Sequence, residues 1–469
     1  MSPNDAGLQP ATIRCVSPID GSTVAERTAF TRQQANDAVA AARAAQADWA
    51  ARPVAERVRL VQAGVARLGE MNDEVVPELA RMMGRPVRYG GEFGGTKERA
   101  DYMAEIAEDA LKPHVVEQSD AFERRIEREP HGVVLIIAPW NYPYMTAINV
   151  LAPALLAGNA VILKHAAQTL LVGERMVRAF VEAGVPEDVC QNIFLDHATT
   201  EWLLQARAFD FVNFTGSVNG GRAIERAAAG TFIPLGLELG GKDPGYVMDD
   251  ADLDAAVDGL MDGAMFNSGQ CCCGIERIYV HESLYEAFVD KAVELMSQSV
   301  LGDPLDEKTT LGPMANQRFA DEVRAQVREA IAEGATPRID PKRFPADDGQ
   351  GTYLAPQILT GVTHDMRVMR DESFGPVVGI MPVKDDAQAV QLMNDSPFGL
   401  TASLWTRDAG RAAAAAARIQ TGTVFMNRCD YLDPALCWTG CKDTGRGGAL
   451  SVIGFHNLTR PKSYHLKKG

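Results

Sequence analysis

Several classes of protein are excluded by what this sequence of 469 residues lacks. No apolar run approaches the roughly 18 to 20 residues that span a membrane, and Met1–Pro10 has neither the basic patch nor the apolar segment of a signal peptide. A formal net charge of −16 argues against nucleic-acid binding. We therefore expect a cytoplasmic protein that binds neither membrane nor nucleic acid.

Cysteine is scarce, with eight in the chain, yet three of them are contiguous: Cys271, Cys272 and Cys273. A chain of this length needs no disulfides to stabilise its core, so reduced thiols are expected. The chain has no Cys-x-x-Cys pair. Cys437 and Cys441 come nearest to that spacing, but neither a second cysteine pair nor a pair of histidines at a matching spacing completes a zinc-binding set. The sequence therefore predicts no metal site.

The length and the 46% of hydrophobic residues predict two or more domains. Residues 31–84 carry apolar side chains at helical spacing behind Thr31, a residue type that caps helices. Gly84 and Pro86 end this pattern, and another helix is expected near Lys97–Leu111.

Strands and helices then alternate. Val133–Ala138 is a continuous apolar run of the kind that is buried on both faces of a sheet. After it we expect helices at Tyr144–Leu156, Thr169–Ala183, Thr200–Ala206 and Arg222–Ala228, and strands at Ala160–Lys164, Gln191–Leu195 and Phe209–Phe214. Repeated βα units predict a doubly wound parallel sheet, which binds a nucleotide at the carboxyl ends of its strands.

The second half is α/β as well, but less regular. We expect helices at Leu253–Met265, Leu284–Ser297 and Gln317–Ala332, a strand at Arg277–Val280, and short strands and helices up to Val424. The segment Thr336–Tyr353, rich in Pro, Asp and Gly, is predicted to be a surface excursion.

Three stretches carry candidate chemistry. The three thiols directly follow Gly269-Gln270. A free thiol in such a place is either a nucleophile or, more often, a small buried hydrophobic residue. Glu238 is an isolated carboxylate in Leu-Glu-Leu-Gly-Gly, and Asn141 lies in Pro139–Pro143. A thiol nucleophile, a carboxylate base and an amide that donates to an oxyanion are the parts that covalent acyl chemistry needs.

Signals for a nucleotide are weaker. No Gly-x-Gly-x-x-Gly is present, but Phe214–Gly221 follows a strand with small residues that let a helix N-terminus approach a phosphate; it could equally be a tight turn. Pro139–Pro143 lies at the end of a predicted central strand. It is either part of a ligand site or a rigid turn that is filled by an aromatic side chain. Lys164 lies at the end of the next strand, where it either binds a ribose or is a solvated charge. Asp371–Pro376 places a carboxylate and an aromatic residue in a turn, which is either part of the site or an ordinary hairpin.

Taken together in their order, these motifs resemble the aldehyde dehydrogenase superfamily, NAD(P)-dependent and non-acylating, from about residue 15 to the end. The resemblance rests on Asn141, Lys164, the Gly216 loop, Glu238, Cys272, Glu372-Ser373-Phe374-Gly375-Pro376, Asn427 and Lys442-Asp443-Thr444-Gly445-Arg446-Gly447. Leu-Glu-Leu-Gly-Gly and Gly-Gln-x-Cys are its most specific elements.

The resemblance implies a role for each of the three catalytic candidates. Cys272 would add to the aldehyde, with the oxyanion held by the Asn141 amide and the backbone N–H of Cys272. Glu238 would activate the water that hydrolyses the resulting thioester. Because relatives that transfer the acyl group to coenzyme A generally lack this carboxylate, the product is expected to be a carboxylic acid.

The resemblance also implies a cofactor, NAD or NADP. Its binding residues would be Ile137, Trp140, Lys164, Gly216, Ser217, Glu238, Glu372 and Phe374. Ala167 stands where relatives that prefer NAD carry a Glu, which leaves NADP open. Asp196-His197-Ala198-Thr199 departs from the usual glycine turn, and no consequence follows from the sequence.

For the substrate, the resemblance implies a tunnel lined by Tyr142, Met145, Thr146, Asn149, Cys271, Cys273, Tyr431, Leu432 and Trp438. This apolar set predicts an uncharged or weakly polar aldehyde. The arginines expected for a semialdehyde are missing except for Arg428. Asp430 and Asp433 would suit an aminoaldehyde, but surface carboxylates are the favoured interpretation. A semialdehyde or aminoaldehyde dehydrogenase that prefers NADP is the alternative.

By the same comparison the chain has three parts. These are an NAD(P)-binding domain (1–117 and 132–239), a catalytic domain (240–445) and an oligomerisation arm (118–131 and 453–469). Ala121–Glu129 and Lys462–Lys467 would add strands to a neighbouring subunit, which predicts a homodimer or homotetramer. An edge so rich in Arg and Lys could instead be blunted against pairing.

Two other functions remain open. One is a thiol hydrolase acting through Cys272, although none of the eight histidines lies in a comparable motif. The other is a binding protein of the same fold without turnover.

Overall fold

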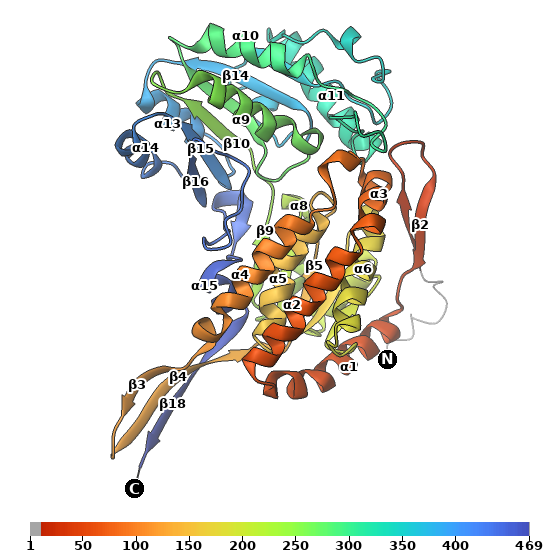
Figure 1. The fold of residues 1–469 in the computed structure, drawn as a ribbon, viewed down its shortest axis with the longest axis vertical. Coiled ribbons are helices and arrows are strands. Elements are labelled where there is room, and N and C mark those ends of the chain that lie inside the picture. Colours follow the sequence, from red (N-terminus) through yellow and green to blue (C-terminus); the bar gives the residue numbers. More distant parts are fainter. Residues whose placement is uncertain (1–10, 469) are drawn as a thin grey trace.

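Two largely parallel sheets and a projecting arm make up the protein (Figure 1). The structure is a computed structural model that describes residues 11–468. The first sheet has six strands in the order β17-β9-β8-β5-β6-β7. Their bounds are β5 Val133–Ile137, β6 Ala160–Lys164, β7 Cys190–Asn192, β8 Phe211–Thr215, β9 Leu235–Glu238 and β17 Gly445–Arg446. Only β17 runs antiparallel, against β9.

Helices cover both faces of this sheet, so the predicted doubly wound architecture is confirmed. Along β5, Val133 and Leu135 pack on one face with α1, α7 and α8, and Val134 and Ile136 pack on the other with α2 to α6. The helices are α1 Arg32–Ala51, α2 Val54–Glu70, α3 Asn72–Met83, α4 Phe93–Leu111, α5 Pro143–Leu156, α6 Leu170–Glu182, α7 His197–Gln205 and α8 Val218–Ala228. Successive residues of β5 face opposite sides of the sheet because side chains alternate in direction along a strand.

The second sheet has seven strands in the order β12-β13-β14-β11-β10-β15-β16, parallel except for β12. The strands are β10 Asp243–Val247, β11 Ile275–His281, β12 Thr336–Pro337, β13 Gln357–Thr360, β14 Val377–Val383, β15 Thr401–Trp405 and β16 Thr423–Met426. Helices α9 (Leu253–Met265) and α10 (Tyr285–Met296) cover one face. The other face is covered by α11 Gln317–Ala332, α12 Arg367–Arg370, α13 Asp386–Asn394 and α14 Ala409–Ala416.

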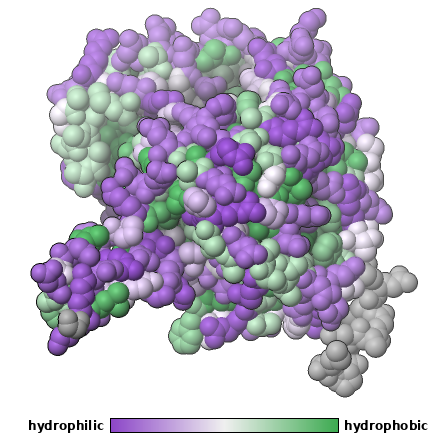
Figure 2. All heavy atoms as spheres, turned by 60° about the horizontal axis from the view of Figure 1, so that its bottom comes forward, coloured by the Kyte–Doolittle hydropathy of each residue, from purple (hydrophilic) through white to green (hydrophobic). Residues whose placement is uncertain are grey.

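The arm is a three-stranded antiparallel sheet in the order β18-β4-β3. Its strands are β3 His114–Gln118, β4 Phe122–Pro130 and β18 Thr459–Lys467, and α15 (Ser451–Asn457) leads into β18. Figure 2 shows it as a mostly hydrophilic projection with a few hydrophobic residues. Val115, Val116 and Leu466 are exposed there.

The element boundaries differ from the prediction where a side chain caps a helix. Helix α7 begins at His197 because the Asp196 carboxylate accepts a hydrogen bond from the backbone N–H of Thr199 at 2.7 Å. Helix α8 begins after Ser217, whose hydroxyl accepts from the N–H of Gly220 at 3.2 Å. The departure at Asp196 is therefore a helix cap.

The segment Thr336–Tyr353 is more than a surface excursion. It begins as edge strand β12, and Ile339 and Phe344 are both buried in the core beneath α9 and α10. The antiparallel pair β1 (Thr12–Val16) and β2 (Thr23–Thr28) was also not predicted.

No helix within residues 11–468 combines the length and apolarity needed to cross a bilayer. The prediction about Met1–Pro10 lies outside the described residues.

Candidate active site

A pocket of about 410 Å³ lies where the two sheets meet. It gathers residues from distant parts of the sequence, as the motif order predicts. The predicted site residues that line it are Trp140, Asn141, Tyr142, Met145, Thr146, Asn149, Gly216, Ser217, Glu238, Cys271, Cys272, Cys273, Glu372, Phe374, Leu432 and Trp438.

The thiols follow a tightly held turn, the 3₁₀ helix η3 (Phe266–Gly269). Asn267 and Ser268 adopt left-handed backbone conformations, with φ of 52° and 55°. Gln270 fixes the end of the turn: its Oε1 accepts from the backbone N–H of Ala315 at 2.8 Å, and its Nε2 donates to the carbonyl of Asn267 at 3.0 Å. The buried amide thus satisfies two backbone groups and sets the direction in which the next residues leave.

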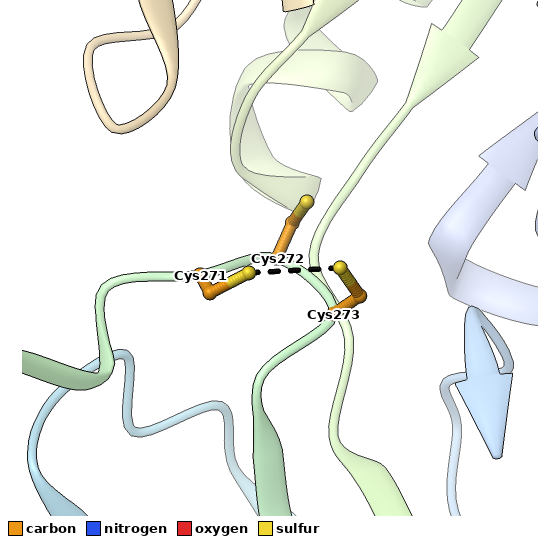
Figure 3. Close-up of side chains that lie close together, drawn as sticks. All are labelled: Cys271, Cys272 and Cys273. Atoms are coloured by element: carbon orange, nitrogen blue, oxygen red, sulfur yellow. Dashed lines mark hydrogen bonds between the residues drawn. The ribbon is translucent and has the colours of Figure 1, made fainter. Parts of the chain in front are cut away.

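The three thiols point in different directions (Figure 3). Cys271 and Cys273 are buried with their sulfur atoms 3.6 Å apart, whereas Cys272 is half-buried and points away from them. All three residues line the pocket. Both buried thiols donate to Oδ1 of Asp430, at 3.1 and 2.9 Å. All three sulfur atoms lie within 4.8 Å of one another, close enough for a thiophilic metal ion to bridge.

This arrangement favours the thiolate of Cys272. The neighbouring thiols of Cys271 and Cys273 hold the pKa of Cys272 well below its usual range, although burial acts in the opposite direction. A thiolate is the nucleophilic form of cysteine.

Glu238 ends β9 and lines the same pocket. Burial, with a smaller contribution from the nearby Cys272, raises its pKa to about 7. The hydroxyl of Thr215 donates to its Oε2 at 3.3 Å. A carboxyl group with this pKa both accepts and releases a proton near neutral pH.

The two glycines after Leu-Glu-Leu are required by close packing. A Cβ at Gly240 would lie 2.4 Å from the carboxylate oxygens of Glu372, and one at Gly241 would lie 2.6 Å from the carbonyl of Cys272. The backbone N–H of Gly241 donates to Oε1 of Glu372 at 3.0 Å. Burial raises the pKa of Glu372 to about 8.

A buried ion pair holds the segment that carries Glu372. The ammonium of Lys242 lies 2.5 Å from Oε2 of Glu276 and donates to the hydroxyl of Ser373 at 2.8 Å. Glu276 in turn accepts from the backbone N–H groups of Ser373 and Phe374, at 2.8 and 2.9 Å. The Asp371–Pro376 turn is therefore anchored to the second sheet.

A second buried ion pair, Arg85–Glu92, holds the loop that carries Asn141. The Arg85 guanidinium donates to the carbonyl of Asn141 and, at 3.3 Å, to Oδ1 of Asn267. Glu92 accepts from two backbone N–H groups at the start of α5, at 3.0 and 2.9 Å. The Asn141 side-chain amide donates to the carbonyl of Gln270 at 3.3 Å, so it lies beside the thiol turn.

Aromatic rings close the pocket on the side of the second sheet. Trp140 stacks on Phe319 of α11, with ring centroids 5.3 Å apart, and meets the ring of Phe374 edge-on at 5.6 Å. Phe319 was not predicted, because it lies on α11 of the second sheet and only the tertiary fold brings it to Trp140.

Two predicted cofactor residues lie outside the pocket lining. Ile137 and Lys164 are neighbours at the carboxyl ends of β5 and β6. The ammonium of Lys164 has no hydrogen bond or ion pair within residues 11–468, and burial lowers its pKa. Ala167 is exposed just beyond it.

This donor and acceptor set fits a dinucleotide. Lys164 offers an unused donor, and the Glu372 carboxylate offers an acceptor to ribose hydroxyls. The N-terminus of α8, at Ser217, lies at the sheet edge where a pyrophosphate would bind.

The structure departs from three expectations about the substrate end of the site. Tyr431 lies outside the pocket lining and donates to Glu98. Arg428 is exposed and stacks on Tyr431, 3.4 Å from the ring centroid. Asp430 is not a surface carboxylate, because it lines the pocket and accepts from two thiols, and burial raises its pKa to about 6. Asp433 is exposed, as predicted.

The prediction also missed Arg99, a buried arginine that lines the pocket. Its sequence signal was present: Arg99 falls on the buried helical stripe formed by Thr96, Ala100, Met103 and Ala107 of α4. A cation on such a stripe indicates a buried charge.

No histidine within the described part of the chain lines the pocket. His165 is buried beneath it, with its ring against the carbonyl of Pro143. The arrangement therefore gives no support to a hydrolase that depends on a Cys–His pair.

A thiolate, a carboxylate and a carboxamide around one pocket, beside a doubly wound sheet, define a nucleotide-dependent enzyme that acts on a carbonyl group. Comparison with known proteins narrows this class. A family model described as the aldehyde dehydrogenase family matches residues 6–464.

Relatives and solved structures agree. The chain is 35% identical to an aldehyde dehydrogenase of Paenarthrobacter nicotinovorans (96% of this chain, 99% of the relative) and 33% identical to an NADP-dependent succinate-semialdehyde dehydrogenase of Deinococcus radiodurans (95% and 93%). The crystal structure of PnpE in complex with NAD superposes with a TM-score of 0.91 at 30% identity, covering 97% of this chain and 94% of that one. The chain belongs to the aldehyde dehydrogenase family. It is an oxidoreductase that oxidises aldehydes with NAD or NADP.

The exposure and pKa of the thiols predict selective alkylation. At pH 6.5, iodoacetamide should modify Cys272 first, because it combines access to the pocket with a lowered pKa. Cys15 and Cys190 should stay unmodified, because both are buried and burial raises the pKa of each to about 12. Tandem mass spectrometry of timed digests measures the order. Equal rates at Cys272 and at Cys437, a half-buried thiol with a raised pKa, would contradict the assignment.

Proposed function

We propose that Cys272, Glu238 and Asn141 oxidise the aldehyde to a carboxylic acid through a covalent thioester. The observation that carries the proposal is that Cys272, the half-buried one of the three thiols, lines a pocket that Glu238 and Asn141 also line. Its thiolate adds to the aldehyde carbon. The Asn141 side-chain amide, which lies beside the thiol turn, donates to the oxyanion together with the backbone N–H of Cys272.

Glu238 acts in the second half of the reaction. In its ionised form it takes a proton from water, which attacks the thioester and releases the acid from the sulfur. Its pKa of about 7 means that this form gains population as the pH rises through neutrality.

The proposed cofactor contacts follow from the unused polar groups of the site. Lys164 and Glu372 bind ribose hydroxyls, while the N-terminus of α8 at Ser217 faces the pyrophosphate. Trp140 and Phe374 shield the nicotinamide from water. When bound, the nicotinamide supplies the acceptor for the hydride. Ala167 leaves room for a 2′-phosphate and brings no repelling carboxylate, which supports NADP as well as NAD.

We also propose that the arm joins subunits into a homodimer or homotetramer, within the division into cofactor domain (1–117 and 132–239), catalytic domain (240–445) and arm (118–131 and 453–469). Strands β3 and β18 have unpaired outer edges, and Val115 and Val116 are exposed. Sedimentation velocity should therefore show no monomer at micromolar concentration.

A cytoplasmic location is supported by eight free cysteines, which suit a reducing compartment, and cell fractionation tests it.

The purified protein, assayed with a panel of aldehydes and with both NAD and NADP, should form reduced cofactor. Cys272→Ser should lower the rate at least about 10³-fold, because a hydroxyl is a far poorer nucleophile than a thiolate. The matched control is Cys441→Ser, a half-buried thiol that donates to the carbonyl of Gln420, and it should retain activity. Turnover that survives in Cys272→Ser would remove this residue from its role.

Glu238→Gln should slow hydrolysis of the thioester more than formation of reduced cofactor. Stopped-flow traces should then show a burst of about one equivalent followed by a steady rate lowered about 10²-fold or more. In the unaltered protein the steady rate should rise with pH through about 7, because the base form is the deprotonated one. The variant should lose that step in the pH profile. A variant without a burst, or with the step intact, would contradict the role of Glu238.

A further inference from the structure

Arg99 is a buried cation that forms no ion pair with any residue of the described range 11–468. It lies on α4, is only 7% exposed and lines the pocket. Its Nη1 donates to the carbonyl of Met145 at 2.9 Å and to Oδ1 of Asn149 at 3.2 Å, both neutral groups. No carboxylate within residues 11–468 lies within 4.0 Å of its nitrogen atoms.

The nearby acidic group is already engaged. Glu92 is paired with Arg85 and accepts from two backbone N–H groups. Burial lowers the pKa of Arg99, but arginine stays protonated in proteins. A buried, unpaired charge costs several kcal/mol, and an anion brought into the pocket would offset that cost.

The polar groups beside Arg99 are donors without partners. Its own Nε and the Nδ2 of Asn149 are buried and form no hydrogen bond, and the hydroxyl of Tyr142 is in the same state. All three residues line the pocket. Guanidinium and amide nitrogens only donate, so the group that satisfies them must accept, as a carboxylate does.

Arg99 shares its cavity with the proposed chemistry. Arg99, Cys272 and Glu238 all line the one pocket of about 410 Å³. An aldehyde bound at Cys272 therefore occupies the same cavity as the guanidinium.

The pocket also contains Asp430, which attracts a cationic substrate less strongly than Arg99 attracts an anionic one. Asp430 already accepts from two thiols, and burial raises its pKa to about 6, so part of its charge is lost near neutral pH. Arg99 keeps its charge and has no ionic partner. Arg428, the arginine suggested by the sequence, stacks on Tyr431 outside the lining.

We propose that Arg99 and Asn149 form an anion-binding subsite, and that the preferred substrate is an aldehyde with a carboxylate at its far end. The inference rests on the proposed function, in which Cys272 attacks the aldehyde. It favours the semialdehyde alternative over the uncharged aldehyde that the sequence predicts.

The test compares substrates of similar length that differ in charge. The purified enzyme should oxidise 4-oxobutanoate with a kcat/KM at least about 10²-fold above that for pentanal. Arg99→Met, which keeps much of the side-chain volume, should lower kcat/KM for 4-oxobutanoate about 10²- to 10³-fold, mainly through KM, since a buried partner of a charged group is lost. Pentanal should change less than about threefold. Arg99→Lys should restore part of the loss, and Arg428→Ala should change neither substrate.

A binding measurement covers the case in which turnover is not observed. Titration of the unaltered protein with succinate in a calorimeter should show saturable binding that Arg99→Met weakens by the same factor. A thermal unfolding curve will show whether Arg99→Met folds. If it does not fold, the substrate preference and the succinate binding of the unaltered protein decide whether the subsite exists.

The outcomes separate the two proposals. Equal use of 4-oxobutanoate and pentanal, with no binding of succinate, overturns the subsite and leaves the proposed function standing. Preference for 4-aminobutanal, lost in Asp430→Asn, overturns it in favour of a cation site at Asp430. Succinate binding through Arg99 without oxidation of any aldehyde supports the subsite and overturns the proposed function.

Discussion

The buried ion pair between Arg85 and Glu92 is the constraint on which the site depends. Arg85 reaches the Asn141 carbonyl and the Asn267 side chain, so one guanidinium ties the loop after β5 to the turn before the thiols. Glu92 satisfies the first N–H groups of α5, where a negative charge also meets the positive end of the helix. Removing either partner would leave an uncompensated buried charge, at about 3 to 5 kcal/mol, and would release both loops together.

The Lys242–Glu276 pair has the same function in the second sheet, where it fixes the turn that carries Glu372. The first pair lies between the end of α3 and the start of α4, and the second lies where β10 and β11 begin. Polar groups held in this way need little reorganisation when charge develops on a substrate. The site is therefore rigid although most of its residues lie in loops or at strand ends, and the stacking of Trp140 on Phe319 joins the two sheets across it.

The sequence predicts the sheets well, because strands buried on both faces and helices with an apolar stripe have distinct periodicities. Helix starts were less accurate, since a cap such as Asp196 is polar and adds no periodicity. The motif residues were found because their spacing is local. Arg99 was missed and Asp430 was expected at the surface for the opposite reason: the environment of a charged residue depends on partners far away in the chain. Neither the thiols beside Asp430 nor the α5 groups beside Arg99 could be paired with them from sequence alone.

The return of the C-terminal segment to the first sheet has a consequence for biosynthesis. Strand β17 completes the edge at β9, and β18 covers β4, so each pairs with a strand translated hundreds of residues earlier. The nascent chain therefore carries two open strand edges until residues 445–467 have left the ribosome. Such edges attract other chains, so the chain is most prone to mispairing and aggregation during that interval.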